Sequence, residues 1–216
     1  MILVFGAGSD MFPGIQSLYP DTVGVTEELC DVTNYQEIEG ALKNSLPDVI
    51  VNLAGVSNLQ PIKDSARIGW IEEVAVNLMG SYNIARASIN SGVKTMIFIG
   101  SVAGKYGKGT HSGYAASKAG VISLVQSLGQ EGYNAYCISP GRVDTKLREK
   151  DFPNERKETR LRPEEIANII PDILDGKYQS GDNIVIRRIG IKTRPIIIDR
   201  GAPWKKRLKI GQPPVC

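Results

Sequence analysis

The chain has 216 residues, of which 42% are hydrophobic and 23% charged, as is ordinary for a globular protein with a full core. Its formal net charge of +3 is small, and basic and acidic residues are mixed along most of the chain, so the charge gives no reason to expect nucleic acid as a partner. The apolar residues 1–5 are too few to cross a membrane and lack the pattern of a signal peptide, so no membrane partner is expected.

Short apolar runs alternate with longer helical patterns along the chain. The runs that predict strands are Ile2–Phe5, Thr22–Val25, Val49–Leu53, Thr95–Ile99, Asn134–Ile138 and Asn183–Ile186. The patterns that predict helices are Thr33–Leu46, Ile71–Asn90, Gly113–Gly129 and Pro163–Leu174. Several of the strands are almost continuously apolar, which is typical of a parallel sheet with both faces covered. The order predicts an α/β fold of three layers, with a doubly wound parallel sheet between helices.

A few polar residues and prolines predict where elements begin. Thr33 and Gln36 have the spacing of a capping box at a helix start. Pro163 is followed by two glutamates, a pattern that suits the first turn of a helix. An N–H in that turn has no partner within the helix, so proline loses no hydrogen bond there, and acidic side chains interact favourably with the helix dipole. Pro195–Ile198 predicts an extra edge strand, and residues 201–216 predict an extended tail.

The three cysteines, Cys30, Cys137 and Cys216, are far apart in the chain. Their spacing matches neither a zinc site nor a disulfide framework, so no metal is expected. Cys137 lies in an apolar run and is expected in the core. Free thiols suit a reducing compartment, and the sequence therefore predicts a cytoplasmic protein.

A glycine-rich turn follows the first predicted strand and contains Gly6, Gly8, Ser9, Asp10 and Met11. Glycines allow a backbone to approach a pyrophosphate closely, and the following helix start supplies free N–H groups. Met11 replaces the third glycine of the dinucleotide motif, so a simple glycine turn remains an alternative. The Asp10 carboxylate would repel a phosphate, and we expect it to cap the following helix instead.

Two further loops fall where a dinucleotide would lie against such a sheet. Asp31 and Val32 follow the second strand, and Asp31 either accepts a hydrogen bond from an adenine amino group or serves only as a turn residue. Asn52, Ala54 and Gly55 follow the third strand, where small residues let the backbone pass beside an adenosine. A simple strand-to-loop turn is the alternative for this second loop.

The most specific pattern is Tyr114 followed by Lys118, because residues four apart on a helix share one face. A free phenol has a pKa of about 10, which is too high for easy proton transfer at neutral pH. A neighbouring ammonium favours the phenolate and would make the tyrosine a usable acid and base. An exposed helical pair without function is the alternative.

Other residues support the chemical interpretation of this pair. Ser101 follows a predicted strand, where its hydroxyl can hold a carbonyl oxygen. Asn77 is a polar amide within an apolar helix, and it either serves a specific bond or binds a neighbouring turn. Residues 140–145 follow another strand, at the edge of the sheet where doubly wound folds bind ligands.

Taken in this order, the motifs resemble the short-chain dehydrogenase/reductase family over roughly residues 1–186. The resemblance implies a single Rossmann domain that binds NAD or NADP in residues 1–200, with residues 201–216 as a tail. It also implies an oxidoreductase that transfers a hydride between the nicotinamide cofactor and a carbonyl or alcohol substrate.

The resemblance assigns a role to each chemical residue. Tyr114 is the general acid and base, and Lys118 lowers its pKa and binds the nicotinamide ribose. Ser101 orients and polarises the substrate carbonyl, and Asn77 positions a water in a proton relay. The residues expected at the cofactor are Gly6, Gly8, Ser9, Asp10, Met11, Asp31, Val32, Asn52, Ala54, Gly55, Lys118, Pro140, Gly141, Val143 and Thr145.

The chain departs from the family pattern at the cofactor end. Asp10 and Phe12 stand where the family turn has two glycines, which changes the expected phosphate geometry. The second strand has neither a clear acid for a ribose hydroxyl nor an arginine for a 2′-phosphate, and Thr26 is the nearest candidate contact. The choice between NAD and NADP therefore stays open.

Residues 146–154 stand where the family places a short substrate lid, and here they are rich in charge. One interpretation is a polar substrate, such as a sugar or sugar nucleotide, with Arg142, Lys146 or Arg148 near an anionic group. A solvated lid surface is the alternative. His111, the only histidine, lies in the loop before Tyr114. It either lines the pocket or lies at the loop surface, and the surface position is expected.

The family resemblance also implies that the helices carrying Asn77 and Tyr114 form a dimer face, so a homodimer or homotetramer is expected. Two other functions remain open. A sugar-nucleotide epimerase or dehydratase would use the same tyrosine and lysine, but such enzymes usually carry a larger C-terminal part. A non-catalytic dinucleotide sensor would explain the altered glycine turn, but sensors of this type often lose the tyrosine or the lysine.

Overall fold

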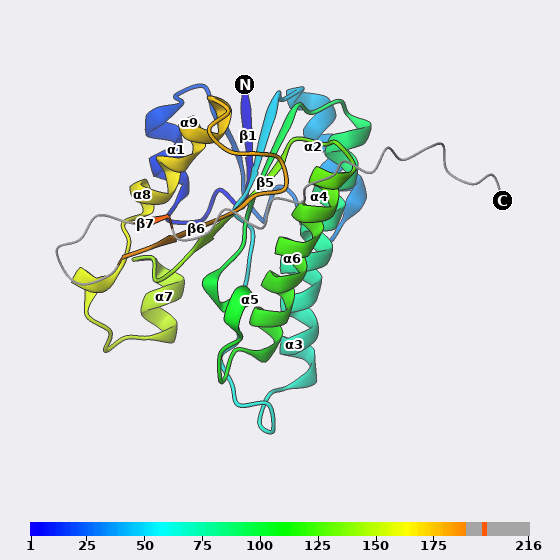
Figure 1. Ribbon diagram of the computed structural model, residues 1–216. Helices are drawn as coiled ribbons and strands as arrows, with labels where there is room; N and C mark the ends of the chain where they lie inside the picture. Colours follow the sequence, from blue (N-terminus) through cyan, green and yellow to red (C-terminus); the bar gives the residue numbers. More distant parts are fainter. Residues whose placement is uncertain (189–195, 198–216) are drawn as a thin grey trace.

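The computed structural model describes residues 1–188 and 196–197, and its centre is a seven-stranded sheet (Figure 1). The strands are β1 (Ile2–Phe5), β2 (Val23–Val25), β3 (Val49–Asn52), β4 (Thr95–Ile99), β5 (Ala135–Pro140), β6 (Asn183–Arg187) and β7 (Ile196–Ile197). Their order is β2-β1-β3-β4-β5-β6-β7. The first six run parallel, and β7 pairs antiparallel with β6. The predicted parallel sheet and extra edge strand are both confirmed.

Helices cover both faces of this sheet. They are α1 (Phe12–Leu18), α2 (Tyr35–Ser45), α3 (Arg67–Val74), α4 (Gly80–Asn90), α5 (Val102–Tyr106), α6 (Ser112–Gln130), α7 (Lys146–Asp151), α8 (Pro163–Ala167) and α9 (Ile169–Leu174). A 3₁₀ turn, η2, covers Lys157–Thr159. In Figure 1, α1, α8 and α9 lie on one face of the sheet, and α2, α4 and α6 lie on the other.

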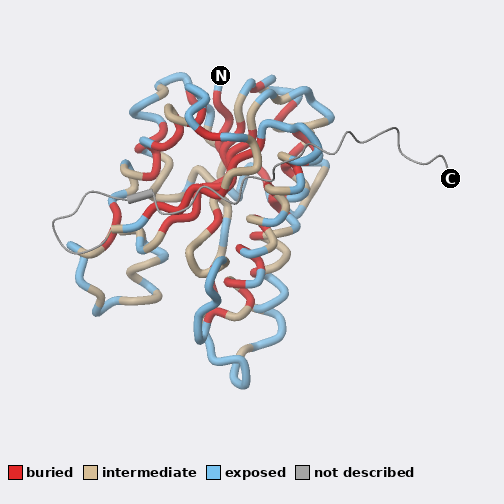
Figure 2. Tube along the Cα trace, in the orientation of Figure 1, coloured by how far each residue is buried: buried red, intermediate tan, exposed pale blue. Residues whose placement is uncertain are grey.

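Each face of the sheet has its own apolar cluster, because alternate strand side chains point to opposite faces. In β1, Ile2 and Val4 pack with the helices of the α1 side, whereas Leu3 and Phe5 pack with those of the α2 side. Figure 2 shows the buried strands as the middle layer of the molecule. The three layers confirm the predicted fold class.

Two predicted helices are interrupted in the structure. The helix predicted at Ile71–Asn90 consists of the end of α3, a π-helical turn at Ala75–Met79 and α4. The helix predicted at Pro163–Leu174 is divided into α8 and α9. Pro171 has no N–H to continue the hydrogen-bond ladder of α8, which is consistent with the break.

The capping box predicted from Thr33 and Gln36 is wrong by one residue. Asn34 is the N-cap of α2, and its side-chain oxygen accepts from the Gln36 N–H at 3.2 Å. Thr33 donates both its N–H and its hydroxyl to Asp31, at 2.8 and 2.9 Å, so it is already engaged in the preceding turn. The start predicted at Pro163 is confirmed, because Glu165 accepts from the Arg162 N–H at 2.7 Å.

The sheet order reverses at β1, whose successors β2 and β3 lie on its two sides. Doubly wound folds bind ligands outside the carboxyl ends of the strands at such a point. A six-stranded Rossmann sheet has the order 3-2-1-4-5-6, with two strands on one side of strand 1. In this sheet β2 is the single strand on that side of β1. After β2, a tight turn at residues 26–30 leads directly toward α2.

The predicted tail at residues 201–216 lies outside the described residues. Among the residues that the structure describes, no helix has both the length and the apolar character needed to cross a bilayer. The same residues contain no group of side chains arranged to hold a metal ion.

Candidate active site

A cavity of about 580 Å³ opens at the carboxyl edge of the sheet. Its walls come from Met11 after β1, from residues 99–103 at the end of β4, from Tyr114 in α6, and from residues 140–143 and Thr145 at the end of β5. The lid, residues 146–154, contributes Leu147, Arg148, Asp151 and Phe152. The structure therefore brings Ser101, Tyr114 and the segment after β5 together around one space. These segments are distant in sequence and meet because parallel strands end at the same edge.

The glycine turn has the backbone geometry that only glycine adopts easily. Gly6 has a φ of +76°, and a Cβ there would lie 2.5 Å from the Ala54 nitrogen. Gly8 faces open space, because nothing lies within 4 Å of the point that a Cβ would occupy. Within the described part of the chain, the N–H groups of Gly8 and Asp10 have no hydrogen-bond partner. The turn thus leaves room and donors for an anionic ligand.

Asp10 does not cap α1 as predicted. Its carboxylate accepts from the Lys146 N–H at 2.6 Å, so it serves the free N-terminal N–H of α7. The N-cap position of α1 is Met11, which makes no side-chain cap. The Asp10 carboxylate is therefore held by the first residue of the lid helix α7 rather than by α1.

Phe12, the second departure from the family turn, is accommodated by a glycine in the neighbouring strand. A Cβ at Gly24 would lie 2.6 Å from the Phe12 ring, so the aromatic side chain occupies the space that a side chain on β2 would need. The missing glycine in the turn is thus matched by a glycine in β2. The α1 helix that follows is only seven residues long, so its dipole is small.

The two loops predicted at an adenosine are ordered by their own side chains. Asp31 accepts from Thr33, which fits the simple turn, and its contact with adenine stays a prediction. Asn52 is buried, donates to the Ser81 hydroxyl at 3.1 Å and accepts from the Ala54 N–H at 3.0 Å. Asn52 therefore fixes the loop that the Gly6 backbone touches.

Tyr114 and Lys118 lie on one face of α6, with the ammonium 5.8 Å from the phenol ring centre. Burial raises the pKa of Tyr114, and its hydrogen bond with Ser101 lowers it by a smaller amount. Lys118 is buried and donates to the Ile99 carbonyl at 2.9 Å, and burial lowers its pKa to about 8. A lowering of the Tyr114 pKa by Lys118 thus stays a prediction for the ligand complex.

Asn77 connects α6 to the loop after β3. It lies in the π-helical turn, is fully buried, and exchanges two hydrogen bonds with the Val56 backbone at 2.8 and 3.0 Å. It also donates to the Ser117 hydroxyl, which donates to the Tyr114 carbonyl. A Cβ on Gly55 would lie 3.1 Å from the Asn77 oxygen, so Asn77 and the Gly55 backbone meet closely. π-Helical turns often mark functional sites.

Glu73 is a site residue that the sequence reasoning missed. It lies one turn before Asn77 and is 2% exposed. Its carboxylate accepts from the Asn58 N–H at 2.7 Å and from the backbone N–H of Tyr114. It therefore caps α6 from another helix, and the absence of a side chain at Gly113 gives it room. The signal available in the sequence was the spacing of four residues between Glu73 and Asn77.

His111 is buried, and the expectation of a loop-surface residue is wrong. Its ring is stacked on Phe152 of the lid, with centres 5.6 Å apart and planes at 9°. It also meets the Tyr114 ring edge-on at 6.3 Å. Burial lowers the pKa of His111. The lid covers this loop, which no pattern in the sequence predicted.

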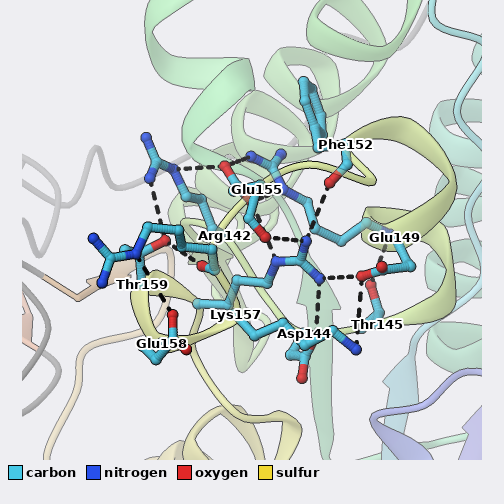
Figure 3. Close-up of polar contacts among 12 residues, drawn as sticks. Arg142, Asp144, Thr145, Glu149, Phe152, Glu155, Lys157, Glu158 and Thr159 are labelled. Carbon is cyan, nitrogen blue, oxygen red and sulfur yellow. Dashed lines mark hydrogen bonds and ion pairs between the residues drawn. The ribbon is translucent and has the colours of Figure 1, made fainter.

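Arg160 is a second residue that the sequence reasoning missed. Its side chain is fully buried and donates to Asp144 at 3.0 Å and to Glu149 at 2.6 Å. It also donates to the carbonyls of Phe152 and Glu155. Figure 3 shows these partners converging from the lid and its two flanks. One arginine thus holds the lid in shape.

Two more hydrogen bonds attach the lid to the body. Ser57, in the loop after β3, donates to Asp151 at 3.0 Å, and Asp10 accepts from Lys146 as described. Thr145 caps α7 by accepting from the Arg148 N–H at 3.1 Å. The lid is consequently anchored at both ends of α7.

The predicted cofactor residues fall into two groups. Met11, Pro140, Gly141, Val143 and Thr145 line the cavity, together with Ser101 and Tyr114. The remaining predicted residues do not line it. They are Gly6, Gly8, Ser9, Asp10, Asp31, Val32, Asn52, Ala54, Gly55, Asn77 and Lys118.

The sequence matches the family model of the short chain dehydrogenases over residues 23–156. The 3-oxoacyl-[acyl-carrier-protein] reductase FabG of Thermotoga maritima is 31% identical over 140 residues, which are 57% of this chain and 56% of that protein. The human (3R)-3-hydroxyacyl-CoA dehydrogenase is 34% identical over 113 residues, which are 48% of this chain and 43% of that protein. The chain thus spans about half the length of the curated relatives it matches.

Two solved structures share the fold at low sequence identity. The aldohexose dehydrogenase of Thermoplasma acidophilum has a TM-score of 0.73 at 19% identity, covering 85% of this chain and 91% of that one. A glucose/ribitol dehydrogenase of Brucella melitensis has a TM-score of 0.77 at 18% identity, covering 89% of this chain and 96% of that one. Because the family model covers more than half of the sequence, this chain belongs to the short chain dehydrogenase family.

Proposed function

We propose that the protein is an NAD(P)-dependent oxidoreductase that interconverts a carbonyl and an alcohol. The observation that carries the proposal is the partly buried Tyr114 at the cavity, hydrogen-bonded to Ser101 and followed one helical turn later by the buried Lys118. The relatives reported above are named as a reductase and a dehydrogenase, which supports the same reaction class.

The residues at the sheet edge fit a nicotinamide dinucleotide. The open space at Gly8 and the free N–H groups of the glycine turn suit a pyrophosphate. The segment after β5, residues 140–145, lines the cavity where a nicotinamide would meet a substrate. When bound, the cofactor supplies or takes up the hydride. The sites support NAD(P) as a class, and the choice between NAD and NADP stays open.

In the reducing direction, Tyr114 acts as the general acid. Its hydroxyl donates a proton to the carbonyl oxygen as that oxygen gains negative charge. Ser101, hydrogen-bonded to the same phenol, is placed to hold the oxygen and polarise the carbonyl. In the oxidising direction, Tyr114 takes the proton from the alcohol.

Lys118 and Asn77 support this proton transfer from behind the tyrosine. The buried Lys118 ammonium contributes positive charge near the phenol. Its donation to a ribose hydroxyl is part of the proposal. Asn77 fixes the start of α6 through Ser117 and the Tyr114 carbonyl. The relay through a water at Asn77 remains part of the proposal.

The proposal includes a homodimer or homotetramer in the cytoplasm. Large apolar side chains are exposed on the helices that carry Asn77, namely Ile68, Ile71, Met79 and Tyr82, and a subunit interface would cover them. Cys30 and Cys137 are free buried thiols, which fits a reducing compartment. Light scattering coupled to gel filtration tests the assembly, and a monomer at micromolar concentration would contradict it.

The function is tested by cofactor binding followed by turnover. We expect NADH or NADPH to bind with a change in nicotinamide fluorescence, and a panel of carbonyl compounds to reveal reduction. Tyr114→Phe should bind the cofactor normally but lose about 10²–10⁴-fold in kcat. Tyr106→Phe is the matched control, because Tyr106 lines the same cavity and has no assigned proton transfer. Binding of neither cofactor, or full turnover by Tyr114→Phe, would contradict the proposal.

The two other functions predict different outcomes in the same experiment. A sugar-nucleotide epimerase or dehydratase would release product without net oxidation of added NADH. A non-catalytic sensor would bind cofactor without turning over any carbonyl compound. The presence of both Tyr114 and Lys118, with the ammonium 5.8 Å from the phenol ring centre, favours catalysis over sensing.

A further inference from the structure

The cavity beside Tyr114 is strongly basic. Five cations line it, and among the described residues one carboxylate does. The cations are Lys108, Arg142, Arg148, Arg187 and Arg188, and the carboxylate is Asp151. The protein's net charge is only +3, so this concentration of positive charge is local. A neutral substrate would gain nothing from it.

Two of the arginines already form bidentate ion pairs. Arg148 donates two hydrogen bonds to Glu155, at 2.7 and 2.5 Å, and Arg188 donates two to Glu165. Asp151, the only acid in the described cavity wall, accepts from Ser57. In these bidentate pairs the guanidinium donors of Arg148 and Arg188 are already engaged.

Arg142 is only partly neutralised. It lies 3.2 Å from Glu155, whose two oxygens already accept from Arg148, and Arg160 also approaches the same carboxylate at 3.4 Å. Three guanidinium groups therefore share one carboxylate. The side chain of Arg142 is 56% exposed and can turn its remaining donors toward a ligand.

Lys108 has no carboxylate within ion-pair distance in the described part of the chain. Its ammonium lies 4.1 Å from the centre of the Phe152 ring, and Arg148 lies 3.8 Å from the same ring. Burial lowers the pKa of Lys108 most, and the charge of Arg148 adds to this effect, while Glu155 and Arg142 act in opposite directions and Asp151 raises the pKa least. The lysine thus stands in a region of positive potential with its charge uncompensated.

The position of Lys108 relates it to the reacting centre. It lies three residues before His111, whose ring meets Tyr114 edge-on and is stacked on Phe152. The cation is therefore separated from the phenol by the His111 and Phe152 rings, rather than in contact with it. Lys146, which the sequence suggested for this role, does not line the cavity.

We propose that the substrate of this enzyme carries an anionic group, a carboxylate or a phosphate, that binds to Lys108 with Arg142 as the second cation. The inference rests on the proposed function, because it places the reacting carbonyl at Tyr114 and Ser101. It adds the chemical class of the substrate and the residue that recognises it. The anionic group binds on the lid side, and the carbonyl binds at the tyrosine.

Matched substrates test the inference by changing one charge at a time. We would compare 4-oxopentanoate with its methyl ester, and dihydroxyacetone phosphate with dihydroxyacetone, using wild type, Lys108→Met and Lys105→Met. Methionine keeps the apolar stem on Phe152 and removes the charge. Lys105 is the matched control, because it also lies over an aromatic ring, that of Tyr106, but does not line the cavity.

Wild type should prefer the charged member of at least one pair, and the preferred pair distinguishes carboxylate from phosphate. Lys108→Met should lower kcat/KM for that anion by about 10–100-fold, the usual effect of a charged hydrogen bond, and leave its neutral partner within about twofold. Lys108→Arg should restore most of the loss, and Lys105→Met should change nothing. The inference would be overturned if the wild type preferred the neutral compound of both pairs. It would also be overturned if Arg187→Met lowered kcat/KM for the anion and Lys108→Met did not.

A binding measurement separates this inference from the proposed function. Calorimetric titration of Tyr114→Phe, saturated with reduced cofactor, with 4-oxopentanoate and with inorganic phosphate should show binding that Lys108→Met weakens about tenfold or more. If Tyr114→Phe binds the anion and also keeps full turnover, the proposed function is refuted and the anion site is not. Reduction of neutral ketones through Tyr114, with no anion binding in the titration, would refute the anion site alone.

Discussion

Arg160 holds the lid through a buried guanidinium, and Arg160→Met would remove it while keeping an apolar stem. The side chain makes hydrogen bonds to two carboxylates, at 3.0 and 2.6 Å, and to two carbonyls, at 3.1 and 2.9 Å. Breaking a buried ion pair typically costs about 3–5 kcal/mol. Here the carboxylate side chains of Asp144 and Glu149 are 41% and 44% exposed and can regain water. We therefore expect a loss of about 2 kcal/mol in the free energy of unfolding.

Urea unfolding measures this loss, and hydrogen exchange shows where the structure opens. Amides in residues 144–155 should exchange faster in Arg160→Met, whereas those of β1 and β3–β5 should keep their protection. Arg156→Met is the control, because its side chain is 69% exposed and pairs with Glu158 only at 3.7 Å. A loss below about 0.5 kcal/mol with unchanged exchange in the lid would refute the idea that Arg160 holds it.

Other substitutions give separate tests. Gly6→Ala should lower the free energy of unfolding by about 2 kcal/mol or more, because the φ of Gly6 is +76° and the new Cβ would lie 2.5 Å from a backbone nitrogen. Gly8→Ala should keep the stability and weaken cofactor binding, because its Cβ would enter open space at the glycine turn. Urea unfolding measures the first effect and nicotinamide fluorescence the second. Equal effects of the two would contradict this assignment. Burial raises the pKa of Glu73 in the folded protein above the ordinary value of 4.5. The stability that its protonated form contributes is therefore lost as the pH rises from 4.5 through this raised pKa. Glu73→Gln should abolish that fall in thermal stability and Glu72→Gln should keep it, and a fall that persists in Glu73→Gln would exclude this residue as its source. Asp48 has its pKa lowered to about 2, chiefly by a lysine hydrogen bond, so its contribution is present above 3.8 and is lost as the pH falls through about 2. Asp48→Asn should therefore be less stable than wild type at pH 7 but equal to it in strong acid, and a gap that persists in strong acid would contradict the assignment.

Much of the sheet could be predicted from the sequence, because buried parallel strands are apolar runs of fixed length. β1 and β4 have the predicted bounds, β2, β3 and β6 differ by one residue at one end, and β5 differs at both ends by one and two residues. The grouping of Ser101, Tyr114 and residues 140–145 around one cavity also follows, since each was predicted at the carboxyl end of a strand or at a helix start beside it.

The errors concern contacts between segments far apart in the chain. Asp10 finds its partner 136 residues away, at the Lys146 N–H, and local spacing could suggest only the nearby helix. His111 is buried by Phe152 of the lid, and its own neighbours in sequence are glycines and hydroxyl residues that suggest a surface loop. Arg160 has an ordinary charged surrounding in the sequence, and only the folded lid shows that it is enclosed.

The shift of the α2 cap by one residue shows a local competition that spacing cannot resolve. Thr33 and Asn34 are both good capping residues. Thr33 is bound to Asp31 in the preceding turn, so Asn34 becomes the N-cap of α2. Burial also differs between two adjacent glutamates, Glu72 and Glu73, which nothing in their local sequence distinguishes. One of them is 2% exposed because the N-terminal N–H groups of α6 and the Asn58 N–H need an acceptor there.

The central claim is that Tyr114 supplies the proton in a cofactor-dependent carbonyl reduction. Single-turnover mixing of the enzyme–NAD(P)H complex with a carbonyl substrate, followed by loss of nicotinamide fluorescence, measures that step directly. The account predicts that Tyr114→Phe binds the reduced cofactor as wild type does but oxidises it about 10²–10⁴-fold more slowly. An equal single-turnover rate in wild type and Tyr114→Phe would contradict it.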